Sequence, residues 1–116
     1  MIIIYKDLLL NETTKKELKD NYYHKDNIIN YVDDNSVITI EYNTNKIYLL
    51  KKGSIISDIE LDINNNTICN VYSQFGNMQM NCECEFININ ENNISFQYKL
   101  LQDNQLVSHI NISVVF

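Results

Sequence analysis

Apolar and polar residues alternate along most of the chain with the period of two that indicates β-strands. The clearest example is Met78–Phe86, in which every second residue is apolar and the residues between are Gln, Asn or Glu. Such a strand packs one face on a core and turns the other toward water. After Phe86 the phase shifts by one residue, because Ile87 and Ile89 are the next apolar positions. We expect a β-bulge at this shift, since an extra residue bends a strand.

The same alternation elsewhere predicts about eight to ten strands, separated by short polar turns. Connections such as Asn43–Asn45 and Gln102–Asn104 have the length of hairpin turns. Many short strands joined in this way favour an antiparallel meander, and closure into a barrel would remove its exposed edges. We therefore predict an all-β fold, a small antiparallel up-and-down barrel that is closed or nearly closed. The other expected strands are Ile2–Tyr5, Ile28–Val32, Val37–Tyr42, Lys46–Leu50, Ser54–Leu61, Thr67–Phe75, Ile94–Leu100 and Ile110–Phe116.

One segment, Thr13–His24, fits two structures. Thr14 and Glu17 have the spacing of a capping box, and the residues up to Asp20 include good helix formers. A single short helix is therefore one interpretation, and a polar strand is the other.

The length of 116 residues is that of one domain, which we take to span residues 1–116. Hydrophobic residues make up 45% of the chain, which is enough for a core, so we expect no disorder. The net charge of −6 disfavours binding to nucleic acids or to anionic membranes. No apolar run approaches the length of a membrane span, and Met1–Lys6 lacks the cationic region of a signal peptide. We therefore expect a cytoplasmic protein.

The chain contains no Ala, Arg, Pro or Trp, but it contains 19 Asn and 18 Ile. The depleted residues mostly have GC-rich codons, so we attribute this bias to an AT-rich bacterial genome and not to function. The Asn-rich runs Asn64–Asn66 and Asn92–Asn93 lie between predicted strands. We expect them in turns, because Asn tolerates the left-handed backbone conformation.

The three cysteines are the nearest approach to a metal site. Cys82 and Cys84 would lie side by side on the core face of a strand, and Cys69 lies on another strand. Structural zinc sites instead use more widely spaced Cys pairs on turns and four ligands in all. We interpret the cysteines as small buried hydrophobic residues and predict no metal, no disulfide and no cofactor.

Candidate catalytic residues are few. His24 lies in a polar stretch, and His109 should face outward because it alternates with Ile110. Glu83 and Glu85 form a carboxylate pair on the water-facing side of their strand, without the apolar surroundings that acid–base catalysis requires. Since the chain also has no nucleophile motif and no glycine-rich phosphate loop, we predict no enzymatic activity.

Eight tyrosines are the strongest candidates for a binding site. Each combines an apolar ring with one hydrogen-bonding group, which suits pockets and interfaces. Tyr42 and Tyr98 continue the apolar rows of their strands and should point inward. Three roles remain open for the tyrosines, namely core filling, lining of a ligand cavity and an oligomer interface.

Several short motifs, in this order, resemble those of a known family. Tyr22–Tyr23 followed by Asn27–Tyr31 is similar to the family's early aromatic hairpin. Lys51–Gly53 stands where the family has an Arg-x-Gly element. Tyr72–Gly76 resembles its Tyr/Thr-x-Tyr/Phe-Gly signature, and Tyr98–Leu100 resembles a late Tyr-x-Leu strand. The family is that of the small bacterial YwiB-like proteins, domains of unknown function with a calycin-like (lipocalin-like) barrel.

The resemblance runs from about Asn21 to the C-terminus and implies that Thr13–His24 is mainly a strand. It implies no activity, because the family has none assigned. The chain departs from the family at Lys51, where a Lys replaces Arg and weakens bidentate recognition of an anion, and at Ser73, where Thr is commoner. Gly76 precedes a long strand, where we expect a bend or a close backbone approach that excludes a β-carbon, so Gly76→Val should destabilise the fold.

We hypothesise that the protein binds a small, partly apolar molecule in the mouth or interior of the barrel. The alternative is a non-catalytic interaction module or homodimer that uses exposed tyrosines or the acidic residues 53–116, which carry the whole net charge. An enzyme using Glu83 or Asp33 with a histidine is the least favoured hypothesis. A hollow interior would favour the ligand binder, and a filled interior with an exposed apolar patch would favour the interaction module. The expected ligand-binding residues are Tyr42, Lys51, Tyr72 and Tyr98.

Overall fold

The computed structural model describes residues 1–116, which form eleven β-strands and no helix. The predicted all-β class is confirmed. The chain therefore has no helix that is long and apolar enough to cross a membrane. The strands are β1 (Ile2–Asp7), β2 (Glu12–Glu17), β3 (Tyr22–Lys25), β4 (Ile28–Asp33), β5 (Ser36–Tyr42), β6 (Lys46–Lys52), β7 (Ile56–Asp62), β8 (Thr67–Ser73), β9 (Gly76–Ile89), β10 (Asn93–Gln102) and β11 (Gln105–Val115).

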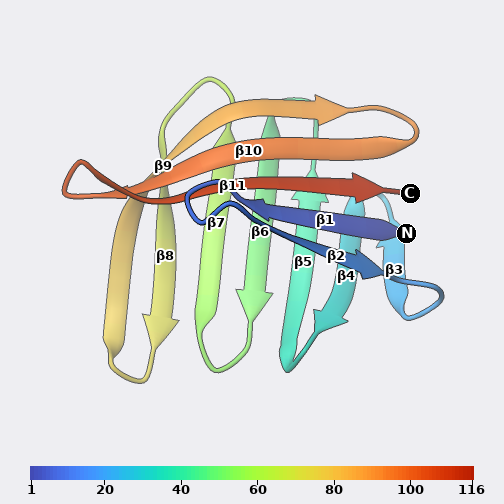
Figure 1. Cartoon of the computed structure of the whole chain (residues 1–116), viewed down its shortest axis with the longest axis horizontal. Coiled ribbons are helices and arrows are strands. Elements are labelled where there is room, and N and C mark those ends of the chain that lie inside the picture. The colour runs from blue at the N-terminus through green and yellow to red at the C-terminus, as the bar shows by residue number, and fades with distance from the viewer.

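All eleven strands belong to one antiparallel sheet in the order β2-β1-β11-β10-β9-β8-β7-β6-β5-β4-β3. Consecutive strands from β3 to β11 are neighbours, as in an up-and-down meander, and β1 pairs Ile2 with Val115 of β11. The two chain ends therefore lie side by side (Figure 1). β2 and β3 are the two edges of the sheet and do not pair with each other. The curled sheet is thus a half-barrel that fits a calycin-like fold left open along one side.

The strand number exceeds the predicted eight to ten because Thr13–His24 contributes two strands. β2 ends at Glu17, residues 18–21 form a bend, and β3 begins at Tyr22. The interpretation of this segment as a strand is confirmed, and its interpretation as a helix is wrong. β2 pairs along its whole length with the Ile-rich β1, and such pairing outweighs the weak tendency of a six-residue segment to form a helix.

The sheet folds into two layers whose strands cross (Figure 1). β3–β8 and the first part of β9 form one layer, and the rest of β9 runs across it with β10, β11, β1 and β2. β9 passes between the layers through the predicted bulge. Cys84 pairs with Tyr98 and Phe86 pairs with Gln97, which leaves Glu85 as the extra residue. Bulges are a usual way for a strand to turn the corner between crossed layers.

The bulge lies one residue earlier than the pattern indicated, and this reverses one side chain. Phe86 lies opposite Gln97, which alternates with buried neighbours and faces outward, whereas Ile87 lies opposite the buried Phe96. The prediction that Phe86 shares the core face was therefore wrong. Because Phe86 and Ile87 are both apolar, the sequence is compatible with the extra residue on either side of Phe86.

The core lies between the two layers and consists of twenty buried apolar side chains. Phe96, in the middle of β10, is the largest one that is fully buried. Each fully buried side chain of this kind stabilises the fold by about 1.5–3 kcal/mol relative to an exposed one. Cys69 and Cys82 are buried as predicted, Cys84 is half-buried, and all three thiols are free.

The Asn runs at residues 64–66 and 92–93 lie at turns, as predicted, but none of their residues has the left-handed conformation. That conformation occurs at six other Asn and Asp residues, including the two-residue hairpins Asp26-Asn27 and Asp103-Asn104. A type I′ hairpin turn needs positive φ at both central residues, which Asn and Asp tolerate better than most side chains. A chain with two glycines thus forms these two hairpins from Asn and Asp.

The two glycines differ in what requires them. Gly76 has a φ of +123°, which side chains rarely adopt, but a β-carbon there would meet nothing within 4 Å. The close approach expected at Gly76 was therefore wrong, and the positive φ is what disfavours a substitution. A close approach does occur at Gly53, where a β-carbon would lie 2.5 Å from Ser36 Oγ.

Candidate functional site

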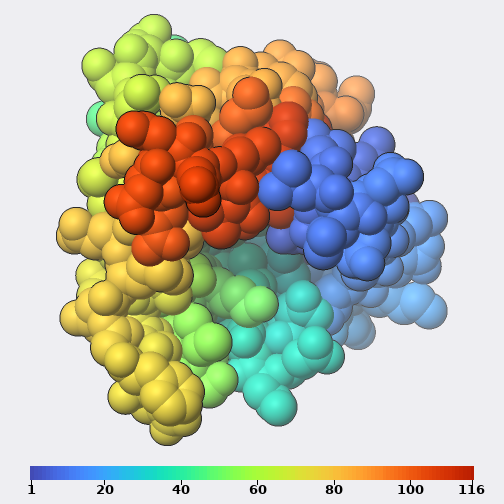
Figure 2. Space-filling view, turned by 60° about the vertical axis from the view of Figure 1, so that its left-hand side comes forward, coloured from blue at the N-terminus to red at the C-terminus, as the bar shows by residue number.

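A cavity of about 750 Å³ lies between the two layers. Figure 2 shows the surface hollowed between the N-terminal hairpin (blue), the C-terminal strands (red) and the strands in cyan and green. Every strand except β3 contributes lining residues. The volume falls within the range of about 300–1,000 Å³ that is common for small-molecule sites.

The first layer presents rows of side chains that lie opposite one another on neighbouring strands. One row, the inner row, is apolar throughout and consists of Ile29, Ile40, Leu49, Ile59, Cys69 and Met80. The next row, the mouth row, is mixed and consists of Tyr31, Ile38, Lys51, Ser57 and Val71. The mouth row lies nearer to solvent, because Lys51 is exposed whereas Ile47 and Leu61, beyond the inner row, are fully buried. The wall therefore changes from apolar to polar toward the opening.

Two tyrosines present hydroxyl groups to this cavity. Tyr98 on β10 is 4% exposed and Tyr31 on β4 is 8% exposed, and both line the cavity. Neither hydroxyl has a hydrogen-bond partner in the protein. Every fully enclosed side-chain polar atom does have a partner, so these two hydroxyls are accessible from the cavity. Burial, aided by the nearby Asp33, raises the pKa of Tyr31 to about 12, and burial also raises the pKa of Tyr98. Both groups therefore remain hydrogen-bond donors.

Charged side chains surround the opening of the cavity. Lys16 Nζ lies 2.9 Å from Asp33 Oδ1, and this ion pair connects the edge strand β2 to β4. Lys15 lies 3.8 Å from Glu17 in an exposed pair. Lys51 has no ion-pair or side-chain hydrogen-bond partner. It is the lysine of the mouth row and is free to contact a ligand.

The four predicted binding residues do not lie together. Tyr98 and Lys51 line the cavity from opposite layers. Tyr42 is buried as expected, but it lies beyond the inner row, where its hydroxyl is 3.0 Å from His24 Nε2. Tyr72 is 40% exposed and lies opposite Asn77, on the outer face of β8. The structure therefore brings two of the predicted residues to the cavity and places the other two outside it.

Most of the residues that line the cavity, among them Tyr5, Tyr31, Lys16 and Asp33, were not among the predicted ones. Tyr31 and Tyr5 each follow a buried isoleucine by two positions in a predicted strand, so the alternation already indicated that they point inward. Lys16 and Asp33 carried no such signal. They are 17 residues apart in the sequence and meet only because the curled sheet brings β2 near β4.

The polar cluster around the β9 bulge lies outside the cavity. His109 Nε2 contacts Glu85 Oε1, and Gln97 Nε2 donates to the same carboxylate at 3.2 Å. Partial burial opposes ionisation of Glu85, but the hydrogen bonds from Gln97 and His109 prevail and lower its pKa. His109 thus faces outward, as predicted, and its contact with Glu85 stabilises the bulge. No group of three or more His, Cys, Asp or Glu side chains is arranged to bind a metal ion.

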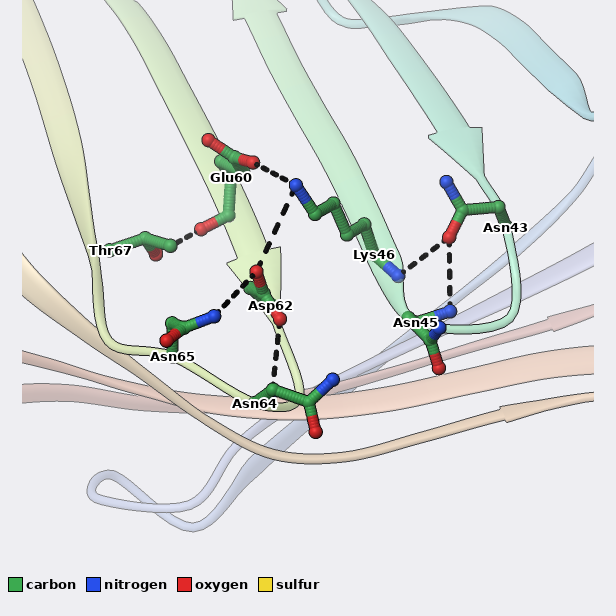
Figure 3. Close-up of polar contacts among 8 residues, drawn as sticks. All are labelled: Asn43, Asn45, Lys46, Glu60, Asp62, Asn64, Asn65 and Thr67. Atoms are coloured by element: carbon green, nitrogen blue, oxygen red, sulfur yellow. Dashed lines mark hydrogen bonds and ion pairs between the residues drawn. The ribbon is translucent and has the colours of Figure 1, made fainter.

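A second polar cluster stabilises turns at the end of the first layer that lies away from the mouth row (Figure 3). Asp62 accepts hydrogen bonds from the backbone N–H of Asn64 at 2.9 Å and from Asn65 Nδ2 at 3.3 Å. Lys46 Nζ lies 3.4 Å from Glu60 and 3.8 Å from Asp62. Because these groups are satisfied within the protein, we assign the cluster a structural role in the β7–β8 turn.

The comparisons with known proteins agree with this architecture. No curated protein matches the sequence. Among solved structures, the YwiB protein from Bacillus subtilis is similar, with a TM-score of 0.64 and 13% sequence identity over 97% of this chain and 83% of that one. At this identity the similarity shows the fold alone. Residues 8–114 match a domain of unknown function, DUF1934. The chain therefore belongs to the DUF1934 family, and its predicted resemblance to YwiB-like proteins is confirmed.

Proposed function

We propose that this protein binds a small, partly apolar molecule in the cavity between its two layers. The observation that supports this most is the pair of buried tyrosines, Tyr31 and Tyr98, whose hydroxyls are open to the cavity and have no protein partner. A hydroxyl that opens into a cavity without a protein partner is available to bond to a ligand or to ordered water. Together with the apolar inner row, they suit a molecule with an apolar body and hydrogen-bond acceptors.

The hollow interior favours a ligand binder over an interaction module, which was expected to have a filled interior. The cavity also offers little for catalysis. Burial, with a smaller contribution from Asp58, raises the pKa of Cys69 to about 11, so the thiol stays protonated and is a poor nucleophile. We therefore propose binding without chemical turnover.

Native mass spectrometry of the purified protein, compared with the same sample denatured, tests this proposal. We expect an additional mass that disappears on denaturation. Leu49→Trp should abolish it, because the larger side chain projects from the inner row into the cavity. Tyr48→Trp is the matched control, since Tyr48 is the neighbouring residue and faces solvent.

Two results would contradict the proposal. A wild-type protein of bare mass would mean that the cavity retains no ligand. An additional mass that survives in Leu49→Trp would place the ligand elsewhere. Circular dichroism of both variants checks that each has folded.

A further inference from the structure

One charged side chain stands on the cavity-facing side of β4–β8 without a partner. That side carries two charged residues, Asp33 and Lys51, and Asp33 is already paired with Lys16. Lys51 lies in the mouth row between Ile38 and Ser57. Charged residues are usually found on the solvent face of a strand, whereas Lys51 lies at the exposed end of the cavity face, where it can contact a ligand that enters the mouth.

The mouth row gathers hydrogen-bond donors around Lys51. Tyr31 lies two strands away, a backbone separation of about 10 Å that two long side chains can bridge, and Ser57 lies on the adjacent strand. An ammonium, a protonated phenol and a hydroxyl can all donate to one group that is rich in acceptors. These are the groups that an oxyanion would need.

Among the charged side chains that line the cavity, lysines outnumber aspartates. Three lysines and two aspartates line the cavity, so its local charge is positive, whereas the whole chain carries −6. Lys16 and Asp33 neutralise each other. Lys15 is paired with Glu17, and Asp34 is exposed in the β4–β5 turn, so Lys51 is the lysine at the opening without an ion-pair partner.

We propose that the ligand is an amphipathic anion, a molecule with an apolar body and one carboxylate- or phosphate-like group. The anionic group contacts Lys51 and Tyr31 in the mouth row, and the apolar body lies along the inner row, where Tyr98 offers a donor to a second polar atom. This inference rests on the proposed function. Because the net charge of −6 provides no long-range attraction for an anion, the selectivity comes from direct contact with Lys51.

Octanoate and 1-octanol test the class of ligand, because they share an apolar chain and differ in charge. Their binding is followed by NMR titration of the amide signals of cavity residues, and we expect octanoate to bind the wild-type protein more tightly. Lys51→Met should weaken octanoate binding about tenfold, as the loss of one charge-assisted contact predicts, and should leave 1-octanol binding unchanged. Lys52→Met removes the same charge from the outer face and should change neither affinity.

The outcomes separate this inference from the proposed function. Equal wild-type affinities for the two compounds, or equal losses in Lys51→Met and Lys52→Met, would overturn the anionic class and leave cavity binding intact. If neither compound shifts the signals of cavity residues, this inference fails, and native mass spectrometry decides the proposed function separately. Thermal melting of both variants shows whether a change in affinity reflects a change in folding.

Discussion

Asn and Asp residues take the place that Gly and Pro have in the turns of most β-proteins. The chain has eleven strands to connect but only two glycines and no proline. Asn43, Asp62 and Asn90 each accept a hydrogen bond from the backbone N–H two residues later. A side chain that reproduces a turn hydrogen bond in this way needs no glycine. At the scale of the residue, a strongly biased composition is therefore compatible with well-defined hairpins.

Asp62→Asn should lower the free energy of unfolding at neutral pH, and the difference from the wild type should shrink in acid. Hydrogen bonds from the Asn64 backbone and the Asn65 side chain lower the pKa of Asp62 from its usual 3.8. The unfolded chain therefore takes up the proton first as the pH falls. The stabilisation is complete above the usual pKa and is lost as the pH falls through the lowered one.

Urea unfolding at neutral pH and at about pH 3 measures this difference. Asp103→Asn is the control, because Asp103 lies in a tight hairpin whose positive φ both residue types tolerate. A difference between the wild type and Asp62→Asn that stays constant across this range would contradict the prediction.

At the scale of the element, the extra residue in β9 joins the two layers. The strand pairs with β8 over its first part and with β10 over its second, and Glu85 lies where the direction changes. The contacts of Glu85 with His109 and Gln97 hold the bulge on the outer face. A regular strand of the same length would continue one layer and leave the cavity without its second wall.

Ile87→Asp should be far more damaging than Phe86→Asp. Ile87 is half-buried against the core, so a carboxylate there would lose part of its hydration, and we expect a loss of about 3 kcal/mol. Phe86→Asp places its charge on the outer face and should cost about 1 kcal/mol. Urea unfolding of both variants measures the two losses, and the reverse order would show that the extra residue lies after Phe86.

At the scale of the whole molecule, the two unpaired edges, β2 and β3, are linked by residues 18–21, and side-chain contacts bridge the opening beside them. Lys16 of β2 reaches Asp33 of β4, and the Phe116 ring lies 4.5 Å from that of His24 in β3, measured between centroids. No backbone hydrogen bonds join β2 to β3. The seam between these edges therefore depends on weaker contacts than the rest of the sheet, and it borders the cavity, because Lys16 and Asp33 also line it.

Breaking the Lys16–Asp33 pair should loosen the seam while barely changing global stability. The two side chains are 33% and 47% exposed, so a double-mutant cycle with alanine should give a coupling energy of about 0.2–1 kcal/mol. Hydrogen exchange of the β2 amides should nevertheless become faster in either variant, and that of β6 should not change. A coupling energy above about 2 kcal/mol would mean that the pair is a main support of the fold.

The sequence by itself determined the elements of this protein. The alternation of apolar and polar residues, the short polar turns and the shift of phase near Phe86 predicted an antiparallel all-β fold with a bulge, and the inward position of Tyr98 followed from the same alternation. These properties depend on residues a few positions apart, because the pleat of a strand and the chemistry of a turn are local.

Only the tertiary structure decided the site. Tyr42 and Tyr98 both point inward, yet one contacts His24 beyond the inner row and the other lines the cavity. Lys51 lines that cavity because the bulge at Glu85 allows β9 to carry a second layer across the first. An inward side chain fills a core or lines a cavity according to what the opposite layer places against it. That layer comes from residues distant in the sequence, so its packing cannot be inferred from any local pattern.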